Sequence, residues 1–222
     1  MPDSRCAAPR RVGGSGPYAG EMAVERVAVL LAAGAGSRFT APGHKLSAEL
    51  PARGAEPAAT VAERALAHVI AAEIGPVVVI TGAAPDVFDH ALPASVIVRH
   101  HPGWEAGQAS TLRTGLAIAR ELGAASAVIG LADQPFVEPD AWRAVADAPG
   151  PIAVATYAGR RGNPVKLDAA VWGLLDDLAV THPDEGARAL MRVRPDLVCE
   201  VPCTGSPADI DTEEDLRRWQ NS

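Results

Sequence analysis

The chain has 222 residues, with 20 Lys plus Arg against 27 Asp plus Glu, which gives a formal net charge of −7. This length fits a single α/β domain with a sizeable core. An acidic chain does not bind nucleic acid by general electrostatic attraction, so any phosphate that it binds must be held by a few local cations. No apolar run reaches the length of a membrane span, and we expect no membrane association.

The N-terminal segment is rich in Gly, Pro, Ser and Arg. It has no apolar h-region, so we do not interpret it as a secretory signal and expect a cytoplasmic protein. Its composition predicts a disordered leader over residues 1–23, followed by one folded domain over residues 24–222.

A buried strand is expected over residues 27–31, because a continuous apolar run is typical of a strand covered on both faces of a parallel sheet. The small residues of 32–37 come next, and they let the backbone approach a ligand closely. Arg38 and Lys45 follow. Backbone N–H groups flanked by two cations suit a triphosphate.

Two common phosphate loops are excluded by single residues. A Walker A loop needs Ser or Thr after its lysine, and Leu46 follows Lys45. The dinucleotide fingerprint needs a third glycine, and Phe39 stands in its place.

Helices and strands alternate along the rest of the chain. Thr60 and Glu63 form a capping box that predicts a helix ending near Gly75. The later expected elements are strands at 77–80, 96–98, 127–131, 152–156 and 198–201, a short helix from Pro85, a helix at 112–122, and a last helix capped by Thr212 with Asp215. This alternation predicts a mostly parallel sheet with helices on both faces.

Asp133 directly follows the strand at 127–131, at the edge where open parallel sheets bind ligands. A single carboxylate there suits Mg²⁺, which completes its octahedron with phosphate oxygens and water. The alternative is a cap for the next helix, but Glu138 and Asp140 are better placed for that. Asp209 and Asp211 alternate in an extended segment, so both carboxylates should point to one side.

The pattern Leu-Ala-Ala-Gly-x-Gly-Ser-Arg-Phe over residues 31–39, followed by Lys45, resembles the signature loop of the MobA-like nucleotidyltransferases. Within that family it is most similar to the molybdenum cofactor cytidylyltransferases. Segments at 107–112, 133–135, 159–165, 182–188 and 209–216 resemble further family motifs in matched order. The resemblance implies a single-domain Rossmann-like three-layer sandwich of the nucleotide-diphospho-sugar transferase type.

The resemblance also implies roles for individual residues. The catalytic residues would be Arg38, Lys45 and Asp133. The nucleotide would contact Leu31, Ala32, Ala33, Gly34, Gly36, Ser37, Arg38, Lys45, Thr81, Gly82, Gly107, Ser110, Thr111 and Asp133. The acceptor would contact Gln134, Pro135, Gly162, Asn163, Pro164 and Arg188. The metal, Mg²⁺ with Mn²⁺ as an alternative, would be held by Asp133 together with Asp209 or Asp211.

Some positions leave two interpretations open. Asn163 stands where the family has His, and it cannot act as an acid or base near neutral pH. The segment around it fits either an acceptor site or an exposed hairpin, and Arg188 fits either an acceptor phosphate or a surface helix. His100 and His101 suggest a metal, but adjacent residues on a strand end point apart, so we favour a surface loop.

The expected reaction is transfer of CMP from CTP to molybdopterin carrying molybdenum, with a molybdenum hydroxylase or its chaperone as the protein partner. Ala33 favours CTP, because relatives that use GTP tend to carry Gly at this position. Two alternatives remain open: a sugar-phosphate nucleotidyltransferase on the same fold, and a non-catalytic carrier or chaperone of the molybdenum cofactor.

Overall fold

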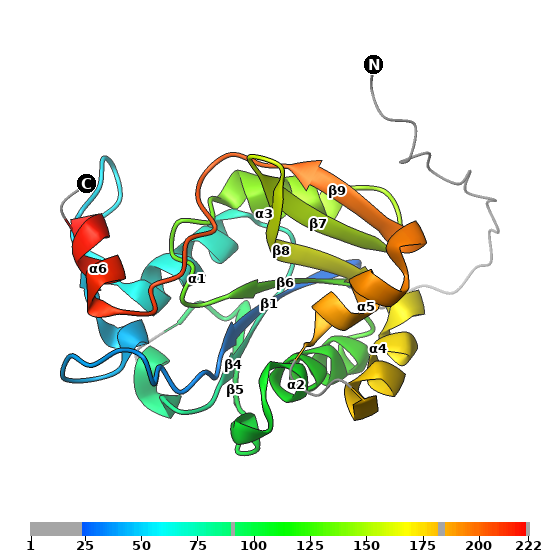
Figure 1. Cartoon of the computed structure of the whole chain (residues 1–222), viewed down its shortest axis with the longest axis horizontal. Coiled ribbons are helices and arrows are strands. Elements are labelled where there is room, and N and C mark those ends of the chain that lie inside the picture. The colour runs from blue at the N-terminus through cyan, green and yellow to red at the C-terminus, as the bar shows by residue number, and fades with distance from the viewer. Residues whose placement is uncertain (1–23, 90–91, 182–184, 221–222) are drawn as a thin grey trace.

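The computed structural model describes residues 24–89, 92–181 and 185–220. In this part of the chain, seven strands form one mixed sheet in the order β5-β4-β1-β6-β8-β7-β9 (Figure 1). The strands are β1 (Arg26–Ala32), β4 (Val77–Thr81), β5 (Val96–His100), β6 (Ser126–Leu131), β7 (Ile152–Tyr157), β8 (Arg160–Asp168) and β9 (Val198–Pro202). Only β8 runs against its neighbours β6 and β7. The predicted mostly parallel sheet is therefore confirmed.

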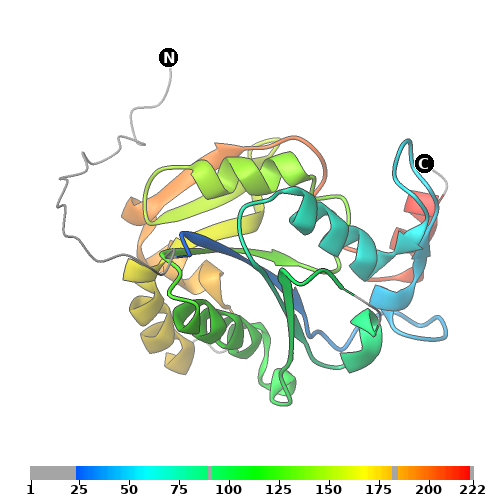
Figure 2. The same ribbon diagram turned by 180° about the vertical axis from the view of Figure 1, so that it is seen from behind.

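Helices cover both faces of this sheet (Figures 1 and 2). One face carries α1 (Val61–Ala71) and α3 (Pro139–Asp147), and the other carries α2 (Gln108–Glu121), α4 (Ala169–Thr181) and α5 (Ala187–Val193). Successive residues of β1 point to opposite faces: Leu30 belongs to the first core, whereas Val29 and Leu31 belong to the second. The three-layer α/β architecture expected from the sequence is confirmed.

The chain reverses its direction of travel across the sheet at β1. From β1 it continues to β4 and β5 on one side, and β6 then pairs with the other edge of β1. The loops that leave the carboxyl ends of β1 and β6 therefore diverge, and such a switch point is where open α/β sheets bind ligands.

A capping box marks the start of α1, whereas α2 starts without a side-chain cap. Thr60 and Glu63 form the predicted capping box at the start of α1, although that helix ends at Ala71 rather than near Gly75. α2 begins at Gln108, one turn before the predicted start at Leu112. Its first turn contains the small residues Ala109, Ser110 and Thr111.

The segment around Asn163 is part of a β-hairpin formed by β7 and β8, with an exposed turn and a half-buried Asn163. β8 is inserted between β6 and β7, and only its first two residues, next to the turn from β7, are exposed. This strand was not predicted from the sequence.

The C-terminal segment contacts the signature loop, where Arg38 pairs with Asp211. A two-stranded ribbon, β2 (Glu49–Leu50) with β3 (Ala59–Thr60), lies next to α6 (Glu213–Gln220). Trp219 of α6 stacks on Phe136, with ring centroids 3.8 Å apart.

The 3₁₀ turns are η1 (Lys45–Ser47), η2 (Pro85–Phe88), η3 (Trp104–Ala106) and η4 (Pro195–Leu197). Across residues 24–89, 92–181 and 185–220, no helix combines the length and apolarity needed to cross a membrane.

Candidate active site

A cleft of about 470 Å³ opens at the carboxyl edge of β1 and β6. Its wall combines the loop after β1, the start of α2, the end of β6 and the segment before α6. Most residues predicted to bind the nucleotide line it: Leu31, Ala33, Gly34, Gly36, Ser37, Arg38, Lys45, Gly107, Thr111 and Asp133. Four chain segments that are distant in sequence thus meet around one space.

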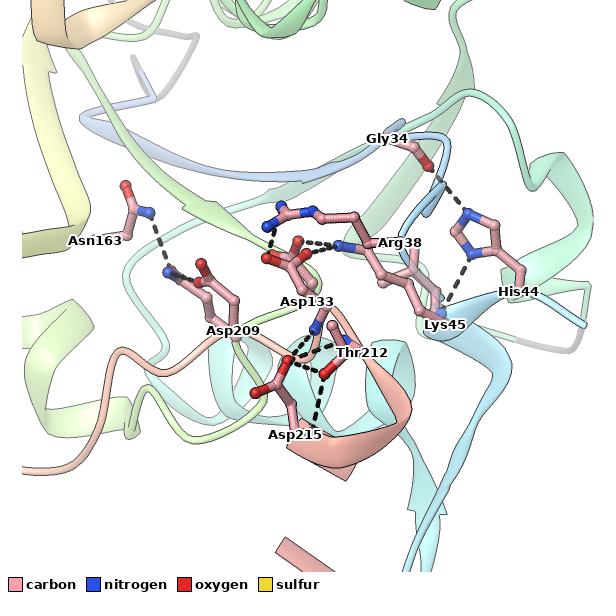
Figure 3. A network of polar contacts seen from close by, with 12 residues as sticks. Gly34, Arg38, His44, Lys45, Asp133, Asn163, Asp209, Thr212 and Asp215 are labelled. Atoms are coloured by element: carbon pink, nitrogen blue, oxygen red, sulfur yellow. Dashed lines mark hydrogen bonds and ion pairs between the residues drawn. The ribbon is translucent and has the colours of Figure 1, made fainter. Parts of the chain in front are cut away.

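Lys45 is the centre of charge in this cleft (Figure 3). Its Nζ lies 2.6 Å from Asp133 Oδ2 and 2.7 Å from Asp211 Oδ1, and Arg38 Nη2 lies 2.8 Å from Asp211 Oδ2. Burial lowers the pKa of Lys45, but the two carboxylates outweigh that effect and raise the pKa above its ordinary value. The ammonium therefore stays charged at neutral pH.

Asp133 carries the clearest sign of a missing ligand interaction. Its Oδ1 is buried and accepts no hydrogen bond, whereas buried polar atoms are normally satisfied. Asp133 also pairs with Lys45, and α3 has its N-cap at Glu138, so Asp133 is not a helix cap. A carboxylate oxygen of this kind fits a divalent cation.

The residues present fit a metal ion whose coordination is completed by the phosphates of its substrate. Asp133, Asp209 and Asp211 all line the cleft. Within the described residues, however, no group of three or more His, Cys, Asp or Glu forms a ready-made metal site. Mg²⁺ is commonly held by one or two carboxylates plus substrate phosphates, so this donor set suits it.

Asp209 is held by a chain of amide hydrogen bonds (Figure 3). Gln134 Nε2 donates to Asp209 Oδ1 at 2.5 Å, and Asn163 Nδ2 donates to Gln134 Oε1 at 3.0 Å. Desolvation raises the pKa of Asp209, the hydrogen bond from Gln134 lowers it, and the Asp133 and Asp211 carboxylates raise it again. The net direction is upward.

A second pocket of about 570 Å³ adjoins the cleft. Of the predicted acceptor residues, it is lined by Gln134, Gly162, Asn163 and Arg188. Both spaces are bordered by Leu31, Gln108, Leu131 and Asp209. Groups bound in the two spaces can therefore meet beside Asp209.

Some predicted site residues lie outside both spaces. Ala32 is in the core, and Pro135 and Pro164 are buried. Thr81 and Gly82 lie behind the signature loop: a Cβ at Gly82 would come 2.6 Å from the Ala33 carbonyl oxygen. These residues support the site instead of lining it.

Ser110 also lies outside the cleft. His101 Nε2 is 2.7 Å from Ser110 Oγ, and His101 Nδ1 is 3.3 Å from Thr114 Oγ1. His101 therefore lies in a loop, as expected, and its ring ties that loop to the first turns of α2.

Several residues that line the cleft were not predicted from the sequence: Ala35, Trp104, Glu105, Gln108 and Leu131. Trp104 and Glu105 form a 3₁₀ turn directly before α2. Residues just before a helix N-terminus are candidate ligand contacts. With the helix predicted to start at Leu112, Trp104 and Glu105 were too far from its N-terminus to be chosen.

The switch-point sheet, the glycine-containing loop after β1 and the Lys45–carboxylate centre together define an α/β protein of the nucleotidyltransferase class. The chain belongs to the MobA-like NTP transferase family, whose domain model matches residues 28–198. The family predicted from the motifs is thereby confirmed.

Individual relatives agree with this assignment. The purine catabolism protein PucB of Bacillus subtilis (strain 168) is 34% identical over 115 residues, which are 50% of this chain and 55% of PucB. The chain thus spans only about half the length of this curated relative.

Solved structures match over more of the chain. Rv0371c from Mycobacterium tuberculosis H37Rv is 29% identical with a TM-score of 0.72, over 90% of this chain and 100% of that one. A complex of Rv0371c with manganese is 27% identical with a TM-score of 0.66, over the same shares.

Proposed function

We propose that this chain transfers CMP from CTP to molybdopterin carrying molybdenum, which yields molybdopterin cytosine dinucleotide and pyrophosphate. The observation that carries the proposal is the Lys45 ammonium held between Asp133 and Asp211, beside the orphaned Asp133 Oδ1. A triphosphate loop needs fixed cations, and a metal on phosphates needs carboxylates; this cleft has both.

The proposed reaction forms one bond and breaks one. A phosphate oxygen of the acceptor attacks the α-phosphorus of CTP, and the bond from that phosphorus to the bridging oxygen breaks. Pyrophosphate leaves with the electron pair, so no covalent intermediate with the protein is needed. The chain accelerates this step by positioning both substrates and by neutralising charge on the phosphate oxygens.

Arg38 and Lys45 hold the triphosphate in this proposal. Arg38 has a side chain that is 72% exposed, so its guanidinium can move to a phosphate, whereas the Lys45 side chain is 8% exposed and has a fixed position. Mg²⁺ bound to Asp133 and to Asp209 or Asp211 would supply Lewis-acid stabilisation of phosphate charge.

The acceptor occupies the second pocket in this proposal. Gln134, Gly162 and Asn163 lie on its wall next to Asp209, and Arg188 offers a guanidinium for a phosphate. Because this pocket joins the cleft, the attacking oxygen and the α-phosphorus can be brought together, and such proximity lowers the barrier of a two-substrate reaction.

Ala33 is the basis for proposing CTP. It lines the cleft and is 5% exposed, and its methyl group lies beside Gly82, behind the loop. In this proposal the extra methyl group favours the smaller pyrimidine base over a purine. We further propose a cytoplasmic location and a molybdenum hydroxylase or its chaperone as the protein partner.

The test is pyrophosphate release with Mg²⁺ and molybdenum-loaded molybdopterin, comparing CTP, GTP and ATP. Release with CTP alone supports both the reaction and the base. Release with GTP keeps the reaction and rejects the role of Ala33. Release only with a simple sugar phosphate as acceptor points to a sugar-phosphate nucleotidyltransferase, and cofactor binding without any release points to a carrier.

A further inference from the structure

His44 joins the two ends of the signature loop. Its Nε2 lies 3.0 Å from the Gly34 carbonyl oxygen near the start of the loop, and its Nδ1 accepts the Leu46 N–H at 3.2 Å just beyond the end. Figure 3 shows the ring facing the Gly34 carbonyl, while the side chain of the neighbouring Lys45 extends the other way, toward Asp133. One side chain therefore bridges about ten residues of backbone.

These two bonds define the protonation state of the ring. A carbonyl only accepts and a backbone N–H only donates, so Nε2 must carry the proton and Nδ1 the lone pair. Burial lowers the pKa of His44; hydrogen bonds to the Gly34 and Ala35 backbone raise it, the Lys45 ammonium lowers it and the Asp133 carboxylate raises it, with a net decrease. The neutral ring is thereby favoured at physiological pH.

The bond to Gly34 turns an acceptor group away from the anion site. A triphosphate loop must present N–H groups, and a carbonyl oxygen facing the phosphates would repel them. The hydrogen bond keeps the Gly34 carbonyl oxygen pointing at the His44 ring (Figure 3).

The loop is also packed directly onto His44 and Lys45. Gly36 adopts a φ of +63°, and a Cβ there would lie 3.1 Å from His44 Nε2 and 3.3 Å from Lys45 Cγ. The Phe39 N–H closes a turn on the Gly36 carbonyl at 2.9 Å. The loop therefore bends around the His44 ring, which packs against Gly36.

We infer that His44 is a positioning residue that clasps the phosphate-binding loop and holds it in the shape that binds a nucleoside triphosphate. This inference rests on the proposed function, because it assumes that the cleft takes a triphosphate. His44 itself touches no reacting atom.

The first measurement is the tautomer of His44 by ¹⁵N NMR of the full chain without nucleotide. The clasp predicts the Nε2–H tautomer with an unprotonated Nδ1. A proton on Nδ1, or shifts like those of a solvent-exposed histidine, would overturn it, whatever the chain binds.

The second measurement uses two variants that separate the two bonds. His44→Gln keeps a donor near the place of Nε2, and His44→Asn keeps an acceptor near the place of Nδ1. We expect H44N to weaken binding of the triphosphate about 3- to 10-fold, the effect of one lost hydrogen bond, and H44Q to restore most of the affinity. The KM for the nucleotide should follow the affinity, while kcat changes less than about 2-fold.

Binding is measured with Mg²⁺ and whichever of CTP, GTP and ATP the wild type binds most tightly, with the melting temperature recorded in parallel. Equal affinity in all three proteins, or a loss confined to H44Q, overturns the clasp. A parallel loss of affinity and melting temperature in both variants also overturns it, because it would show a general structural role. If the wild type binds no triphosphate, the proposed function fails, and the tautomer still decides whether the clasp exists.

Discussion

The ammonium group of Lys45 lies 2.6 Å from Asp133 Oδ2, and this contact joins residues 88 positions apart in the sequence. One lies beyond the loop after β1 and the other follows β6, so the pair ties together the two loops that diverge at the switch point. The sheet topology thereby places a cation and a carboxylate within reach of the same phosphate group.

Asp133→Ala should abolish most nucleotidyl transfer. The variant removes both the partner of Lys45 and the orphaned Oδ1. We expect pyrophosphate release to fall by at least about 100-fold, because losing a metal ligand costs more than losing an outer partner. The exposed Asp140→Asn is the control, and unchanged transfer in D133A would reject the metal assignment.

Gln134→Leu should weaken metal binding, although Gln134 is not itself a metal ligand. Gln134 holds Asp209 Oδ1 and is itself 7% exposed, so a leucine fills its space but leaves the carboxylate unsupported. We expect the affinity for Mn²⁺ in the presence of CTP to fall about 10-fold or more, measured by EPR.

Asn163→Ala is the matched control for Gln134. It breaks the outer hydrogen bond but keeps the one between Gln134 and Asp209. Its Mn²⁺ affinity should stay within about 2-fold of wild type, a smaller change than loss of an outer-shell partner causes. Equal losses in both variants would show that Gln134 does not orient Asp209.

Ala33→Gly should relax the choice of base. The variant removes a methyl group that packs beside Gly82 on the wall of the cleft, and one such group is worth about 1–3 kcal/mol of discrimination. We expect the ratio of kcat/KM for CTP to that for GTP to fall about 10-fold. Ala35→Gly, also on the cleft wall, controls for loop flexibility, and an equal change in both would contradict the role of Ala33.

Asp215→Ala should destabilise the chain in a pH-dependent way. The Thr212 hydroxyl, with the Thr212 and Asp211 N–H groups, donates to Asp215 and lowers the pKa of its carboxyl below 3.8. A lowered folded pKa gives stability that is present above the unfolded pKa and is lost as pH falls through the folded pKa.

We therefore expect D215A to lose about 1 kcal/mol of unfolding free energy at pH 7, the usual effect of a lost helix cap. The difference from wild type should shrink below pH 3.8 in urea titrations. Glu214→Ala, in the same turn but exposed, should show neither effect. A D215A deficit that is independent of pH would rule out the ionised cap.

The sequence predicts features that depend on local patterns. The apolar run of β1, the capping boxes at Thr60 and Thr212 and the strand-end position of Asp133 each depend on a few neighbouring residues, and the structure confirms them. Their physical causes act within one or two turns of chain, so a single sequence contains them.

Features that depend on distant partners could not be predicted. β8 is a strand because it fits between β6 and β7, and the bond of Gln134 to Asp209 spans 75 positions. The early start of α2 also escaped prediction, because Ala109, Ser110 and Thr111 are small and show no strong apolar period.

The most direct test of the central claim is mass spectrometry of the products formed from CTP and molybdenum-loaded molybdopterin with Mg²⁺. We predict molybdopterin cytosine dinucleotide and an equal amount of pyrophosphate, with neither formed by D133A. Intact CTP and unmodified molybdopterin after incubation with the wild-type chain would contradict the proposed function.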